Sequence, residues 1–73
     1  MIETFAEGLI ELHDSNGVVP ILLNARRVAY LRPNNANGDE TDGGTFVSLS
    51  DPVAYLEVIE SYRDIKEALR KLP

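Results

Sequence analysis

The chain has 73 residues, no cysteine and a formal net charge of −5. This length limits it to one domain, residues 1–73, whose core rarely supplies more than roughly 3–5 kcal/mol unaided. The absence of cysteine excludes disulfides, thiolate metal sites and cysteine nucleophiles, and the acidic balance makes nucleic-acid binding an unfavoured function because phosphates attract clustered Lys and Arg.

No segment has the character of a membrane span or a signal peptide. The longest apolar run, residues 18–23, is far shorter than the about 20 residues that a spanning helix needs. The first residues carry acid instead of the basic flank of a signal peptide. We therefore expect a soluble, cytoplasmic protein.

Two strands and a tight turn are predicted after an N-terminal extension at residues 1–8. Residues 9–13 alternate apolar and polar, which turns Ile10 and Leu12 inward. Asn16-Gly17 is a strong hairpin signal, and the second strand covers residues 18–23. Pro20 cannot donate to a ladder, so it indicates an edge position or a bulge.

The middle of the chain predicts two more strands around a long loop. A half-turn from Asn24 leads to a strand at residues 27–32, and another strand covers residues 45–49. The polar, glycine-rich loop at residues 34–44 is acidic and is expected to be mobile. Its acids do not match the spacing of a calcium loop, so no metal is expected there.

The last segment, residues 51–73, fits two structures. One helix from Pro52 would align apolar residues at heptad spacing: Tyr55, Val58, Tyr62, Ile65 and Leu69. Alternatively, residues 55–60 form a strand rich in β-formers, and Ser61 caps a helix. We favour the strand and helix because a serine suits a cap better than a helix interior. The predicted fold is thus mostly β (α+β), a five-stranded antiparallel meander or small open barrel with a C-terminal helix.

In this order, the chain resembles the FlbD/SwrD-like family of small flagellar and swarming-motility proteins. The resemblance rests on Asn16-Gly17, on the Leu-Asn-Ala that ends an apolar strand at residues 23–25, and on the Glu-Ser before the helix at residues 60–61. It implies a motility-linked protein without enzymatic activity. We accordingly expect a non-enzymatic adaptor or interaction protein with an unidentified protein partner.

Catalytic and metal chemistry has little support in the residues. His13 is the single histidine, so no imidazole pair can build a metal site. We expect His13 to be an exposed residue of the hairpin without a catalytic role. No phosphate-binding glycine loop occurs. We expect no catalytic residues and no cofactor.

Three arginines gather in one short segment: Arg26, Arg27 and Arg32. They predict either a contact with an anion or acidic partner, or a solvated strand end with weak surface ion pairs. With Tyr30 as a stacking platform, the same segment would suit the alternative function, a small nucleic-acid-binding β-barrel.

Apolar residues remain after one sheet face is filled. If Leu23 and Val58 face the core, then Leu22, Tyr55 and Ile59 point away from it. A second subunit is the simplest cover for them, which predicts a homo-oligomer. A bulge near Pro20 would instead shift the register and bury these residues internally.

Overall fold

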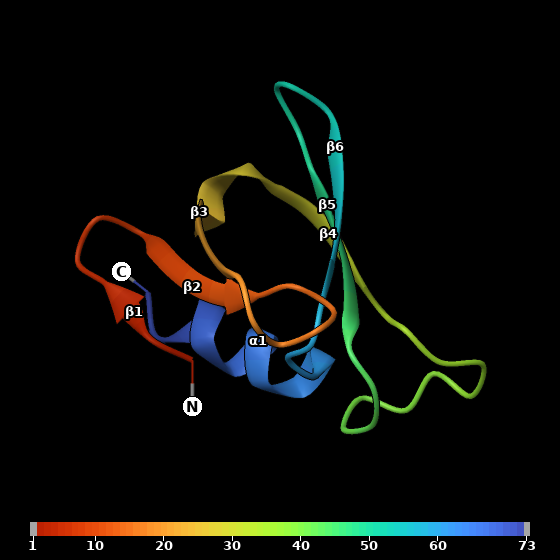
Figure 1. Ribbon diagram of the computed structural model, residues 1–73. Helices are drawn as coiled ribbons and strands as arrows, with labels where there is room; N and C mark the ends of the chain where they lie inside the picture. The colour runs from red at the N-terminus through yellow and green to blue at the C-terminus, as the bar shows by residue number, and fades with distance from the viewer. Residues whose placement is uncertain (1, 73) are drawn as a thin grey trace.

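The computed structural model describes residues 2–72 as six short strands, one 3₁₀ turn and one α-helix (Figure 1). The elements in chain order are β1 (Thr4–Phe5), β2 (Leu9–His13), β3 (Pro20–Asn24), η1 (Ala25–Arg27), β4 (Val28–Pro33), β5 (Thr45–Leu49), β6 (Ala54–Val58) and α1 (Tyr62–Arg70). The prediction of a mostly β protein with a C-terminal helix is confirmed.

The strands form two three-stranded antiparallel sheets, β1-β2-β3 and β4-β5-β6, each connected as a meander. Among residues 2–72, one bridge joins them, between Asp14 and Val58, and the Ile59 amide donates to the His13 carbonyl there at 3.0 Å. The predicted five-stranded meander or small open barrel is therefore corrected: residues 2–72 form six strands, which are divided between two sheets and do not close into a barrel.

The sixth strand lies in the predicted N-terminal extension. Thr4 and Phe5 pair with Ile10 and Leu9, and Gly8 makes the intervening turn with a φ of 80°. That φ suits glycine, which has no Cβ to clash. Two exposed residues are too few to show an alternating pattern, which is why β1 was not predicted.

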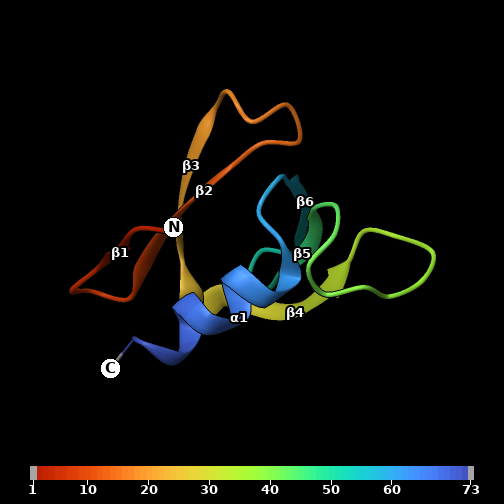
Figure 2. The ribbon, with the colours of Figure 1, turned by 90° about the horizontal axis from the view of Figure 1, so that it is seen from below.

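The core lies between the two sheets and the helix. Its buried apolar residues come from β2, β3, β5, β6 and α1: Ile10, Leu12, Leu23, Val47, Val58 and Ile65. Figure 2 shows α1 running beneath both sheets. The expected inward faces of β2 and β3 are confirmed, and Pro20 occupies the edge strand β3 of its sheet, as its missing amide demands.

The segment after residue 51 folds as a strand followed by a helix. β6 ends at Val58, and the Ser61 hydroxyl accepts a hydrogen bond from the Asp64 amide at 3.2 Å. A capping serine contributes about 1 kcal/mol. The competing single-helix interpretation is wrong, because Ala54–Val58 pair with β5.

The loop between β4 and β5 has its own hydrogen bonds and touches the helix. The Asn35 side chain accepts from the Asp39 amide at 2.8 Å and donates to the Asp42 carbonyl at 3.0 Å. Glu40 accepts from the Arg63 amide through its carbonyl and from Lys66 Nζ through its carboxylate, each at 2.9 Å. The loop is thus tied to the start of α1, and its mobility stays a prediction.

Candidate interaction surface

The outer face of the β4-β5-β6 sheet carries a row of two tyrosines around a serine. Residues directly opposite each other in an antiparallel pair share a face, and Ser48 lies opposite both Tyr30 and Tyr55. Ser48 is buried, whereas Tyr30 is 55% and Tyr55 72% exposed. The larger rings therefore flank the serine and present their own surfaces to solvent.

A second row on this face combines an aromatic ring with both signs of charge. Phe46 lies opposite Arg32 in β4 and Glu57 in β6. The Arg32 guanidinium lies 4.8 Å from the centroid of the Phe46 ring, which is a cation–π distance. The face thus combines aromatic rings with one positive and one negative charge, whereas the chain as a whole has a net charge of −5.

One edge of this sheet has unpaired backbone groups. The Ile59 amide points away from β5, toward His13. Because strand residues alternate in hydrogen-bonding direction, the N–H and C=O of Tyr55 also point away from β5. No backbone or side-chain partner occupies them among residues 2–72. Tyr55 therefore presents an open donor, an open acceptor and an exposed ring.

The three predicted interface residues are exposed, but they do not share one face. Leu22 (57% exposed) lies in β3 opposite Glu11, in the other sheet from Tyr55. Ile59 (49% exposed) follows β6 and covers Gly17 in the β2–β3 turn. The prediction of a single second face assumed one continuous sheet, and the division into two sheets separates these residues.

The three arginines of the predicted anion contact lie at three separate places. Arg27 donates to the carbonyls of Ser50 and Asp51 and so fastens the β5–β6 turn to η1. Arg32 covers Phe46 on the outer sheet face, and Arg26 lies at a separate pocket. They do not converge on one anion site.

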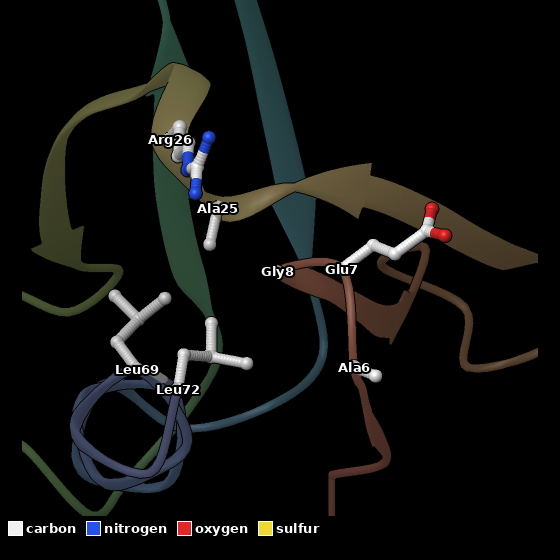
Figure 3. Close-up of a pocket in the computed structure, with 7 residues that line it drawn as sticks. All are labelled: Ala6, Glu7, Gly8, Ala25, Arg26, Leu69 and Leu72. Carbon is white, nitrogen blue, oxygen red and sulfur yellow. The ribbon is translucent and has the colours of Figure 1, made fainter.

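The pocket at Arg26 lies where the end of α1 approaches the β1–β2 turn. It measures about 540 Å³ and is lined by Ala6, Glu7, Gly8, Ala25, Arg26, Leu69 and Leu72. Figure 3 shows Leu69 and Leu72 facing this space from the helix, while the Glu7 carboxylate points away from it. The pocket offers an apolar floor and a single cation.

His13 has a carboxylate partner that the sequence did not reveal. Its Nδ1 lies 2.6 Å from Glu60 Oε2, and its backbone amide donates to Glu60 Oε1 at 2.9 Å. Glu60 is only 13% exposed at its side chain. The hydrogen bond to Glu60, followed by the nearby negative charges of Glu60, Glu11 and Asp14, raises the pKa of His13 above its ordinary value. Local patterns cannot show a contact between residues 47 positions apart.

We expect this pair to make the stability of the fold depend on pH. Since the folded pKa of His13 exceeds the unfolded value, its contribution is complete below the unfolded pKa of about 6.5 and is lost as pH rises through the folded pKa. We expect a higher urea midpoint at pH 6 than at pH 9, with most of the difference absent in Glu60→Gln. A wild-type midpoint that is unchanged or higher at pH 9 would show that the pair does not couple to folding.

Among residues 2–72, no three His, Asp or Glu side chains gather as metal ligands would. No helix in this described part of the chain is both long and apolar enough to cross a membrane. Comparisons with protein-family models, with curated proteins and with solved structures found no match to the chain. The resemblance to motility proteins therefore stays a prediction.

Proposed function

We propose that this protein is a non-enzymatic interaction module that associates with itself and works through protein contacts. The observation that carries the proposal is the number of large apolar side chains left in solvent by so small a domain. They are Phe5, Val18, Val19, Leu22, Tyr30, Val53, Tyr55 and Ile59. Two of them, Tyr30 and Tyr55, lie in one row on the outer face of the β4-β5-β6 sheet, and apolar side chains grouped on one exposed face are typical of an interaction site.

The size of the core supports the same proposal. Among residues 2–72, the buried apolar cluster has six members, and Ala68 is buried in addition to them. A core in a chain this short leaves a small margin of stability. A partner that binds only the folded chain adds to that margin by mass action. Association would therefore serve both stability and function.

The resemblance to small motility proteins suggests what kind of second partner this chain would bind. We propose that a cytoplasmic protein of a flagellar or swarming system occupies surface that self-association leaves free. The pocket at Arg26 and the exposed hairpin residues Val18 and Val19 lie outside the β4-β5-β6 sheet. They are the first places to test with such a partner.

Analytical ultracentrifugation tests the self-association directly. At 0.15 M salt, we expect the wild-type mass to rise above the 8.1 kDa of one chain as protein concentration increases. Tyr55→Glu should reduce this rise because it places unpaired charge in a contact, which costs several kcal/mol. Tyr30→Glu is the matched control, with the same change of charge on the same sheet face. A wild-type chain that sediments as a monomer at every concentration would contradict the proposal.

A nucleic-acid-binding module is the second candidate, favoured by one observation. Tyr30, Phe46 and Tyr55 share a sheet face with Arg32, and exposed aromatics beside a cation can stack bases. The accompanying Glu57 and the separation of Arg26 and Arg27 from this face oppose it. A salt series decides, since phosphate contacts weaken steeply between 50 and 200 mM salt. Binding of single-stranded RNA that disappears over that range would favour the second candidate.

A further inference from the structure

We propose that β6 pairs edge to edge with β6 of a second copy of this chain, antiparallel and about a two-fold axis at Tyr55. This deepens the self-association proposed above, on which it rests, by naming the surface and its register. The pairing would join two three-stranded sheets into one of six strands, in the order β4-β5-β6-β6-β5-β4.

The first reason is that β6 has hydrogen-bonding capacity that the monomer leaves unused. β5 occupies one side of β6, and among residues 2–72 the segment that follows β2 pairs with the other side at the bridge between Asp14 and Val58. The Tyr55 amide and carbonyl lie beyond that bridge and point outward. Figure 1 shows the β5–β6 hairpin extending past the rest of the domain.

The second reason is that the other strand edges are protected and this one is not. Native proteins protect edges with prolines, bulges, short strands or covering helices. β1 has two residues, β3 begins with Pro20, and β4 has an irregular register at residues 28–30, ends at Pro33 and lies beside α1. From Ala54 to Val58, β6 has no proline, no lysine and no bulge.

The third reason is that the register is self-complementary. A two-fold axis at Tyr55 sets this residue opposite its own copy, so that each backbone amide donates to the other carbonyl. Glu57 then lies opposite Val53 of the second copy, and like charges are not directly opposed. On the outer face, the row Tyr30–Ser48–Tyr55 continues into the same row of the second copy.

The choice of a second copy over a foreign strand follows from this symmetry. An isologous contact uses one surface twice, and two-fold dimers are the commonest soluble oligomers. Each exposed Tyr55 ring, 72% accessible in the monomer, would gain an aromatic neighbour of equal size. Cross-strand aromatic pairs stabilise antiparallel sheets.

Single-cysteine cross-linking tests the register, since the natural chain has no cysteine to interfere. In a hydrogen-bonded antiparallel pair, the Cα atoms of opposite residues are about 5.5 Å apart. We expect Tyr55→Cys to give a covalent dimer with a short bismaleimide in high yield. In Tyr30→Cys the two cysteines would be five strand spacings apart, about 24 Å, so at least tenfold less dimer is expected. Leu22→Cys, on the other sheet, provides a second control.

The outcomes separate this inference from the proposed function. If the wild type associates but Tyr55→Cys cross-links no better than Leu22→Cys or Tyr30→Cys, the edge pairing is overturned and the self-association stands. If the wild type stays monomeric and no variant cross-links, both are overturned. Circular dichroism of each variant must match the wild type, and Tyr55→Phe, which retains the ring, should associate as the wild type does.

Discussion

Replacing Gly44 by alanine is expected to remove most of the stability of the fold and to lower its urea midpoint sharply. A Cβ built on Gly44 would overlap the Val58 carbonyl oxygen and would lie 3.2 Å from the Val58 carbonyl carbon. These are backbone atoms at the end of β6, so no side-chain rotation can relieve the clash. Glycine in a strand context often marks such a close approach of backbones. We expect a loss of about 3 kcal/mol, comparable to the whole margin of a domain this small.

Gly38→Ala separates this clash from the ordinary cost of replacing a glycine. Gly38 has a φ of 69°, but nothing lies within 4 Å of the Cβ that alanine would add. Its backbone strain should cost about 1 kcal/mol. Urea unfolding followed by circular dichroism measures both variants. Equal midpoints for the two would contradict the close contact between the start of β5 and the end of β6.

Ile65→Ala should be nearly as damaging, because one side chain links the helix to both sheets. Ile65 is fully buried and belongs to the cluster formed with Ile10, Leu12 and Val58. Truncating a buried isoleucine costs about 2–5 kcal/mol through lost transfer energy and the cavity that remains. We expect a large fall in the urea midpoint, with α1 lost together with the sheets in one transition.

Two substitutions calibrate the Ile65→Ala result. Ile65→Val removes one methyl group and should cost about 0.5–1.5 kcal/mol. Glu67 lies on the exposed side of the same helix, so Glu67→Ala should change the free energy of unfolding by less than about 0.5 kcal/mol. If Ile65→Ala resembled Glu67→Ala, the helix would not be docked on the core, and the fold described above would be wrong.

Local patterns predicted most elements but not how the sheets are divided. The alternation at Ile10 and Leu12 and the cap at Ser61 depend on neighbouring residues, and both are confirmed. The bridge between Asp14 and Val58 joins distant segments, and its position follows from how far each hairpin extends. The sequence therefore predicted the strands more accurately than it predicted which strands share a sheet.

The interaction surface was predictable only in part for the same reason. Alternation along β6 placed Tyr55 outward, which is confirmed by its exposure. That Tyr30 shares its row depends on the register irregularity between Val28 and Tyr30, and a shift of one residue reverses the face of every side chain. Likewise, nothing in the pattern at Arg27 indicates that it holds the β5–β6 turn.

Amide hydrogen exchange at Tyr55 tests the association of β6 edges most directly. In the monomer this amide has no acceptor, whereas the Leu56 amide points toward β5, where Leu56 pairs with Val47. We predict that Tyr55 exchanges fast in dilute protein and becomes protected as concentration rises, while Leu56 is protected throughout. A Tyr55 amide that exchanges at the same fast rate at every concentration would contradict the pairing of β6 with β6 of a second copy.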